Sequence, residues 1–333
     1  MINKDYINPK LHTLHVEQES TRAGFGEALY KLGHDRASVV VLTADLKEST
    51  KVDKFAAAFP DRFFDVGVAE QNLAAVASGM AAMGKIPFIT TYAIFSPGRN
   101  WEQIRTTICY NNQPVKIIGC HSGLMTGPDG GSHEALEDIA LTRVLPRMTV
   151  VAPCDAVEAA KATKAIADID GPVYLRLGRE KVPTITTKET PFKVGKISVM
   201  HESPKAQVTI FACGPQVYTA LVAAKKLKED GIEVNVINNH TIKPLDEKGI
   251  LAEVKKTRAV VTVEDHQVAG GMGSAIAELL VQHYPVPMEF IGVLDKFGQS
   301  GSHHVLYEHY GISVPAIMDA VQMVLARKLK IEV

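Results

Sequence analysis

Residues 115–133 read VKIIGCHSGLMTGPDGGSH, an apolar run that leads into a loop rich in glycine. The run at 115–118 is short and partly β-branched, as is typical of a strand buried on both faces. Glycine and proline exclude regular structure from the loop and let its backbone come close to a ligand. In that setting His121, Asp129 and His133 are suited to bind a polyol or an oxyanion and to move protons. The alternative is a surface loop that ends in a capped helix start.

Apolar runs of this kind alternate with helical patterns along the chain. The other strand-like runs are 38–42, 148–151, 173–175, 208–211, 233–237 and 259–263. The clearest helical patterns are 21–32, 71–83, 101–110, 155–167, 216–229 and 273–282. Such alternation predicts an α/β fold whose mainly parallel sheets carry helices on both faces. Ligands bind these sheets beyond the carboxyl ends of the strands, and the loop at 121–133 is expected there.

The segment 181–195 interrupts the alternation. It contains two prolines and four threonines and shows no apolar periodicity, which is typical of a connection between domains. The sequence therefore predicts two consecutive doubly wound domains, residues 1–185 and 195–333, joined by a linker at 186–194.

Composition narrows the classes of function. The 333 residues carry 36 basic and 37 acidic side chains, a net charge of −1, so the basic excess typical of nucleic-acid binding is missing. No apolar run approaches the ~20 residues of a membrane span. The polar stretch at 1–19 is not typical of a signal peptide. The four cysteines form no CxxC pair, which argues against a zinc site or a disulfide framework and favours a reducing, cytoplasmic setting.

A second segment, FFDVGVAEQN at 63–72, runs from a strand through a glycine turn into a helix rich in alanine that opens with Glu70. Because almost every residue of this helix is small or apolar, we expect the helix to be buried. A carboxyl at a buried edge has a raised proton affinity, which suits a proton donor near neutral pH. The simpler explanation is a helix start stabilised by an acidic side chain, worth about 0.3–1 kcal/mol.

Aromatic and basic side chains complete the candidates. Tyr92 and Phe95 follow a strand-like run and are able to stack on a flat heteroaromatic ring, although core packing also accounts for such a pair. Arg22 lies at a helix start and Arg179 after a strand, where each is able to bind phosphate or carboxylate, or simply to be solvated. Ser49 follows a strand-like run and, taken alone, shows no feature that indicates a function.

Neither of the usual nucleotide-binding loops is present, because the chain has no GxxxxGK[ST] motif and no GxGxxG between a strand and a helix. The glycine turn at 270–273 precedes a helical pattern. Its backbone N–H groups are suited to bind an anion, or its glycines serve close packing of the helix.

Together these motifs resemble one family. DVGVAEQ at 65–71 and the loop at 121–133 are similar to segments of the transketolase pyrimidine-binding domain, and the other candidates follow at matching intervals. The resemblance covers nearly the whole chain from about Thr21. It implies the C-terminal half of a transketolase, a pyrimidine-binding domain followed by a C-terminal domain. The length and the GRNW stretch at 98–101 resemble split transketolases, in which two genes encode the two halves.

The resemblance implies a thiamine diphosphate enzyme that transfers a two-carbon ketol unit from a ketose phosphate to an aldose phosphate. Glu70 matches the glutamate that hydrogen-bonds the aminopyrimidine ring of the cofactor and favours its imino form. The imino nitrogen then takes the proton from the thiazolium carbon. Tyr92 and Phe95 match the aromatic pocket around the aminopyrimidine ring. Asp45 matches an aspartate near the cofactor and the dimer interface.

Substrate contacts also follow from the resemblance. Four positions match residues that hold the sugar phosphate: Arg22, Ser49, His121 and Arg179. Asp129 matches the aspartate that recognises a substrate hydroxyl and so selects one stereochemistry. His133 matches a histidine at the reactive end of the substrate, where it hydrogen-bonds and transfers protons. With Glu70, the two histidines are the expected catalytic residues.

Two departures from the family pattern matter. The family has another aromatic residue three positions past Phe95, where this chain has Gly98, so the pocket is either more open or filled by a partner. The GDG…N motif that binds the magnesium and the diphosphate is absent, so no metal ligand is expected on this chain. We therefore expect a partner subunit that carries this motif and the Mg²⁺. Thiamine diphosphate would lie between the subunits, and two such pairs would form a heterotetramer.

Other proteins with these domains are the alternatives, namely 1-deoxyxylulose 5-phosphate synthase and the beta subunit of a 2-oxo acid dehydrogenase. The combination of His121, Asp129 and His133 argues against the dehydrogenase, whose substrate is not a polyol. A non-catalytic partner of the same fold is expected to lack Glu70 or the histidines, and a flavodoxin-like binding module does not explain them together. The segment EDHQVAGG at 264–271 is similar to C-terminal domains of this superfamily and is assigned to packing and dimerisation.

Overall fold

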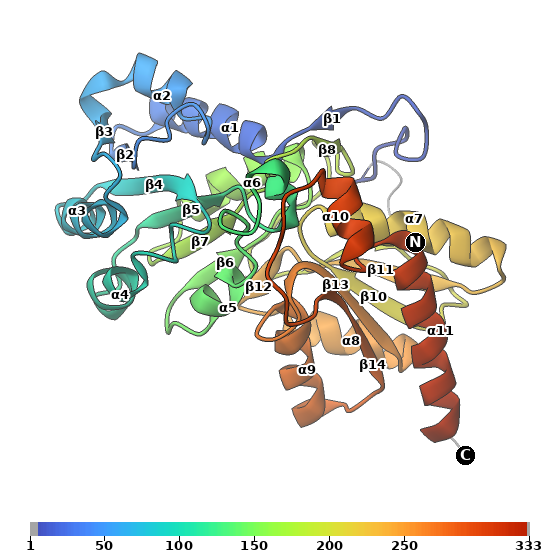
Figure 1. Ribbon diagram of the computed structural model, residues 1–333. Helices are drawn as coiled ribbons and strands as arrows, with labels where there is room; N and C mark the ends of the chain where they lie inside the picture. Colours follow the sequence, from blue (N-terminus) through green and yellow to red (C-terminus); the bar gives the residue numbers. More distant parts are fainter. Residues whose placement is uncertain (1–5, 332–333) are drawn as a thin grey trace.

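The computed structural model describes residues 6–331 and arranges them around two large sheets (Figure 1). The N-terminal half, in blue and green, and the C-terminal half, in yellow and red, lie side by side. The prediction that no signal peptide begins the chain concerns residues 1–5 in part, and these lie outside the described residues. No helix within residues 6–331 combines the length and the apolar character that a membrane crossing requires.

The first sheet carries the candidate loop. Within residues 6–331 its strands are, in spatial order, β12 (Thr241–Lys243), β6 (Thr149–Val151), β7 (Val173–Arg176), β5 (Lys116–Cys120), β4 (Ile86–Tyr92), β2 (Val39–Thr43) and β3 (Phe63–Asp65). All pairs are parallel except β12 with β6. Because parallel strands end at one edge, the loops that follow β4, β5 and β7 lie together.

Helices cover both faces of this sheet. α1 (Thr21–Asp35) and α6 (Ala156–Ile166) pack against each other on one face, and α3 (Glu70–Ala82) packs on the other. The strands are apolar on both sides for this reason. Val41 of β2 belongs to the core beneath α1, whereas Leu42 belongs to the core beneath α3. Other helices of this half are α2 (Asp53–Ala58), α4 (Trp101–Gln103) and α5 (Asp138–Arg143).

Two helix predictions need correction. The helix that begins at Glu70 is not buried all round, because one side of α3, including Gln71, Ala75 and Gly79, is exposed. The helix predicted over 101–110 is α-helical only in α4 and continues as a π-helical turn, Ile104–Tyr110. The hydroxyls of two threonines in this segment bond to carbonyls four residues earlier, an arrangement that bends helices.

The second sheet repeats the architecture. Its strands within the described residues are, in spatial order, β14 (Met288–Val293), β13 (Val260–Gln267), β10 (Val208–Ala212), β11 (Val234–Asn238) and β9 (Ser198–His201). All pairs are parallel except β9 with β11. The flanking helices are α7 (Gln216–Glu229) and α11 (Val314–Ile331) on one face and α8 (Glu247–Thr257) and α9 (Met272–His283) on the other. The predicted α/β class with two mainly parallel sheets is confirmed.

The two halves are joined more closely than the sequence indicates. β12 comes from the C-terminal half but pairs with β6 and so completes the edge of the first sheet. At the N-terminus, Leu11 belongs to the core of the second sheet, and β1 (Gln18–Glu19) pairs with β8 (Val182–Pro183). The β12–β6 pairing and the packing of Leu11 join the two sheets, so a loop of one half is able to lie against the other.

Candidate active site

The candidate side chains gather at the carboxyl edge of the first sheet. Tyr92 is the last residue of β4, His121 follows β5 directly, and Arg179 follows β7 after a short turn. The starts of α1 and α3 bring Arg22 and Glu70 to this edge. The parallel topology thereby assembles side chains from five separate segments of the chain.

Aromatic and imidazole rings stack at the centre of the site. The rings of Tyr92 and His121 are nearly parallel with centroids 3.8 Å apart, and the Phe95 ring lies parallel to Tyr92 at 5.8 Å. His133 meets the Phe95 ring edge-on at 5.6 Å, and its Nδ1 lies 2.9 Å from Ser132 Oγ. His121 has a φ of +53°, a conformation that costs free energy for a residue with a side chain, so the surrounding loop holds it there.

Arg22 faces His121 across the site. Its Nη1 donates to the carbonyl of Ser49 at 2.6 Å and lies 3.3 Å from His121 Nε2, and its Nε donates to the Arg179 carbonyl at 3.1 Å. Burial, with the charges of Arg22 and Arg179, lowers the pKa of His121 to about 3, so its imidazole is neutral near pH 7. Because Nε2 faces an N–H donor, we assign the imidazole proton to Nδ1. This Nδ1 is buried and has no hydrogen-bond partner within residues 6–331.

Arg179 and Asp129 form the opposite side of the site. Arg179 Nη1 donates to the Thr126 carbonyl at 2.7 Å and to Asp129 Oδ1 at 3.0 Å. The side chains of this pair are 28% and 30% exposed, so both keep polar atoms open to a ligand. Arg179 Nε also lies 3.5 Å from Glu180 Oε1, so acidic side chains accompany this arginine. The guanidinium groups of Arg22 and Arg179 are nevertheless suited to bind an anionic group of a substrate.

The second domain fixes the loop that carries these residues. Leu124–Asp129 is a short 3-10 helix followed by turns, and α5 begins only at Asp138. A helix start at Ser132 or His133, the alternative raised from the sequence, is therefore wrong. The N–H of Leu124 donates to Asp265 Oδ1 at 2.9 Å, so β13 of the second sheet anchors the loop.

Glu70 lies at the start of α3 with its side chain only 4% exposed. The Nη1 atom of Arg99 lies 3.6 Å from Glu70 Oε2, and the Arg99 guanidinium carbon lies 4.4 Å from the centroid of the Phe95 ring. Asn100 Nδ2 donates to the Glu70 carbonyl at 3.0 Å. Contacts therefore connect Glu70 through Arg99 and Phe95 to the stacked rings.

Three predicted positions stand apart from this set of contacts. Asp45 is exposed, and its N–H donates to Asp65 Oδ1 at 3.0 Å at the β2–β3 edge, so its assignment to a cofactor stays a prediction. Ser49 contributes its carbonyl to Arg22. A Cβ at Gly98 would overlap the carbonyl of Ile94, so this backbone excludes a side chain there. Whether the pocket is more open or filled by a partner stays a prediction.

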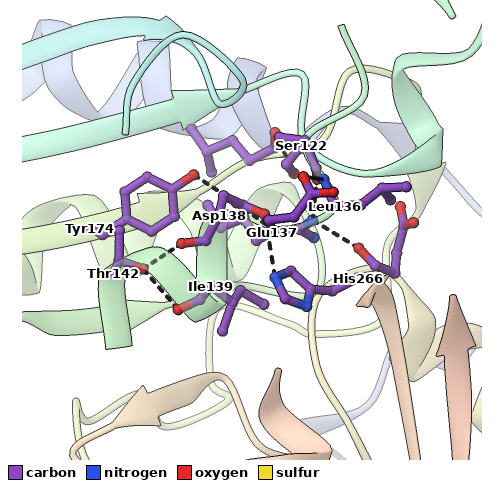
Figure 2. A network of polar contacts seen from close by, with 12 residues as sticks. Ser122, Leu136, Glu137, Asp138, Ile139, Thr142, Tyr174 and His266 are labelled. Atoms are coloured by element: carbon purple, nitrogen blue, oxygen red, sulfur yellow. Dashed lines mark hydrogen bonds and ion pairs between the residues drawn. The ribbon is translucent and has the colours of Figure 1, made fainter. Parts of the chain in front are cut away.

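Sequence reasoning missed a buried polar network behind the loop (Figure 2). The Tyr174 hydroxyl and Arg176 Nε donate to Asp138 Oδ2 at 2.7 and 2.8 Å. Arg176 Nη2 also donates to the carbonyls of Ala135 and Asp265, at 3.2 and 2.8 Å. The network therefore ties the candidate loop to the second domain. The sequence signal that could have found this network is Arg176 at the end of an apolar strand. A charge buried at such a position requires a partner.

His266 of β13 completes this network (Figure 2). Its Nδ1 donates to the Gln267 carbonyl at 2.7 Å, and its Nε2 accepts from the N–H of Ala140 at 3.4 Å. Burial lowers the pKa of His266 to about 4, so the ring is neutral near pH 7 and acts as a fixed hydrogen-bonding link.

The glycine turn at 270–273 binds an anion of the chain itself. The N–H groups of Met272 and Gly273 donate to the two carboxylate oxygens of Glu264 at 2.7 and 2.9 Å. A Cβ on Gly271 would overlap the same carboxylate. Close packing therefore explains this turn, and these two N–H groups are not open to an external anion.

Glu134, next to His133, has a buried and poorly hydrogen-bonded carboxylate. It is 2% exposed, and the backbone N–H of Gln299 stabilises its charged form only in part. The carboxylate packs against Gly298, where a Cβ would overlap it. Burial, with the carboxylates of Asp265 and Asp129 nearby, raises the pKa of Glu134 to about 7.

The substitution Glu134→Gln is expected to change how stability depends on pH. Because the pKa of Glu134 is raised above its ordinary 4.5, the folded state loses stability as pH rises from about 4.5 to about 7. Glutamine does not undergo this loss. The free energy of unfolding of the variant relative to wild type should therefore rise over this window by up to roughly 3 kcal/mol and stay level above it. Urea denaturation at several pH values measures this difference. A difference independent of pH would contradict the prediction, and Glu229→Gln, at an exposed glutamate, is the matched control.

Comparison with known proteins decides the family. Residues 17–184 match the family model described as "Transketolase, pyrimidine binding domain", and residues 195–317 match "Transketolase, C-terminal domain". This chain belongs to the transketolase family. The resemblance stated from the sequence is confirmed, and the two matched regions correspond to the two sheets except for β12, which lies in the second region and completes the first sheet.

Relatives of similar length are transketolase subunits. The 6-deoxy-6-sulfo-D-fructose transketolase subunit SqwH of Clostridium sp. is 39% identical, over 94% of this chain and 97% of the relative. A subunit of the apulose-4-phosphate transketolase of Phocaeicola vulgatus is 34% identical, over 89% and 94%. A solved structure described as a split gene transketolase, inactive beta4 tetramer, is 45% identical, with a TM-score of 0.87 over 93% of this chain and 99% of the other. Over nearly its whole length this chain is thus similar to subunits of split transketolases.

Proposed function

We propose that this subunit takes part in the ketol transfer of a split transketolase, in which a two-carbon unit moves from a ketose phosphate to an aldose phosphate with thiamine diphosphate as cofactor. The observation that carries the proposal is the continuous series of contacts that runs through Glu70, Arg99, Phe95, Tyr92, His121 and Arg22. These contacts bring a carboxylate, parallel aromatic rings and arginine side chains into one site, whereas no single sequence motif supplies all three kinds of group.

The residues present fit one half of thiamine diphosphate. The parallel rings of Tyr92 and Phe95 suit contact with a flat aminopyrimidine, and the Glu70 carboxylate is joined to them by Arg99. The metal-bound diphosphate finds no counterpart in the described part of the chain, where no group of His, Cys, Asp or Glu is placed to hold a metal ion. The diphosphate and its Mg²⁺ are therefore assigned to a partner subunit with the GDG…N motif.

Each side chain has a distinct task. Thiamine diphosphate, when bound, supplies the carbanion chemistry that breaks and forms carbon–carbon bonds. Glu70 holds a proton at the aminopyrimidine ring nitrogen. His121 lies with Arg22 at the side that would receive the anionic group of the sugar, and Asp129 accepts from a substrate hydroxyl. His133, beside the stacked rings, moves a proton at the reacting oxygen of the sugar.

The deciding experiment compares this chain alone with this chain co-expressed with the product of the adjacent gene. Ketol transfer from xylulose 5-phosphate to ribose 5-phosphate is measured with Mg²⁺ and thiamine diphosphate, and Glu70→Ala serves as the inactive control. Activity in the pair alone, with the mass of a heterotetramer, supports the proposal. Activity of the isolated chain would overturn the shared site.

The same assay tests the substrate class. The two related subunits are named for a sulfonated ketose and a sugar phosphate, and both compounds carry an anion that Arg22 and Arg179 are able to bind. A complex that binds thiamine diphosphate but is inactive on xylulose 5-phosphate and active on 6-deoxy-6-sulfofructose would show that the substrate is a sulfonated ketose and not a ketose phosphate.

Arg179→Ala in the paired subunits is expected to raise the KM of the ketose phosphate about 10–100-fold with a smaller change in kcat, because a hydrogen bond to a charged group contributes about 1.5–3 kcal/mol. A ketose without the anionic group should show no such rise. Steady-state kinetics with both substrates measure the difference, and Arg105→Ala, at an exposed arginine, is the matched control. An equal rise for both substrates would contradict the prediction.

A further inference from the structure

Arg99 has no chemical task in the proposed mechanism, yet the chain holds its backbone firmly. The residue lies in the turn between β4 and α4, and its N–H donates to the Phe95 carbonyl at 2.8 Å. The next residue, Asn100, is fully buried and donates to Ser96 Oγ at 3.2 Å and to the Glu70 carbonyl at 3.0 Å. Hydrogen bonds therefore join this turn to the start of α3 and fix the backbone position of Arg99.

The Arg99 side chain contacts both groups that the proposed function gives to the aminopyrimidine. Its guanidinium lies over the Phe95 ring at 4.4 Å and has an Nη1 atom 3.6 Å from the Glu70 carboxylate. Within the described residues no other lysine, arginine or histidine nitrogen lies within 4 Å of that carboxylate. Glu70 is 4% exposed whereas Arg99 is 55% exposed, so the cation covers the acid from the solvent side.

Gly98 makes this arrangement possible. A side chain at that position would overlap the Ile94 carbonyl, so the turn presents no side chain there, and the side chain of Arg99 covers Phe95 instead. A guanidinium is planar and weakly hydrated, and it both stacks on a ring and pairs with a carboxylate.

We propose that Arg99 is a positioning residue that holds the Glu70 carboxylate and the Phe95 ring in the arrangement that receives the aminopyrimidine of thiamine diphosphate. The inference rests on the proposed function and extends it to a residue that acts through Glu70 and Phe95.

The test measures thiamine diphosphate binding to the paired subunits by calorimetry, without substrate. Arg99→Ala is expected to weaken binding about 3–30-fold, the sum of an exposed cation–π contact and an ion pair. Arg99→Lys should restore only part of the affinity, since an ammonium keeps the charge and not the planar stacking. Arg105→Ala should match wild type.

Measuring Glu70→Gln in parallel separates the two proposals. Binding that depends on Glu70 but not on Arg99, or that is tighter in Arg99→Ala, would overturn the inference and leave the proposed function standing. A merely structural role would lower the thermal midpoint of Arg99→Ala and leave its affinity for the cofactor unchanged below that midpoint, and that result also overturns the inference. A wild-type complex that binds no thiamine diphosphate would overturn the proposed function and this inference together.

Discussion

Glu70→Gln is expected to lower kcat for ketol transfer by the paired subunits about 10²–10⁴-fold, since positioned acid–base groups contribute rate factors of this size. Glutamine keeps the shape of the side chain but cannot exchange a proton with the aminopyrimidine nitrogen. The sugar KM should change little, because Glu70 contacts Arg99 and Asn100 rather than the Arg22–His121–Arg179 group. Steady-state kinetics at saturating cofactor measure both constants.

The matched control is Glu102→Gln, at an exposed glutamate on α4. It removes the same charge from a neighbouring element and should leave kcat unchanged. If Glu70→Gln retains full kcat at saturating cofactor, the acid–base assignment of Glu70 is wrong, even if the family assignment stands.

The strands were predictable because burial on both faces leaves a plain signal. The run at 38–42 became β2 and the run at 115–118 became β5, each shifted by a residue or two. β12 was not predictable, because it is a strand of three residues at a sheet edge, and its partner β6 precedes it by far in the sequence. Pairing between distant segments depends on tertiary packing, which a local pattern does not record.

The same distinction applies to the site. Residues that follow strand ends, such as His121 and Arg179, were predictable because parallel topology brings the strand ends together. Arg99 and Arg176 were not, because their importance lies in what a long side chain reaches after folding. The helix after Glu70 was expected to be buried from its composition alone, but composition does not say which neighbours cover it. Within residues 6–331 one side of α3 has no covering element.

Among the substitutions considered, Arg176→Met should lower the free energy of unfolding most, by about 3–5 kcal/mol. Breaking a buried ion pair leaves the remaining charge buried without a partner. The arginine side chain is 5% exposed and Asp138 is 2% exposed. Removing the cation leaves two buried carboxylates, those of Asp138 and Asp265, without the charge that now stabilises both. It also breaks the links from Arg176 to the carbonyls of Ala135 and Asp265, which join the candidate loop to the second domain.

Asp138→Asn should cost less than Arg176→Met, and this ordering tests the physical account. The asparagine carbonyl oxygen still accepts from Arg176 or from the Tyr174 hydroxyl, and the Asp265 carboxylate remains near the guanidinium. Urea denaturation of both variants measures the free energies of unfolding. Equal losses of unfolding free energy would show that the pairing with Asp138 alone explains the stabilising effect of Arg176. A larger loss for Asp138→Asn would contradict the account. The expected order, with Arg176→Met lower, would identify the arginine as the shared counter-charge of the loop and the second sheet. Loss of the Arg176 side chain would then remove hydrogen bonds that join the candidate loop to the second domain.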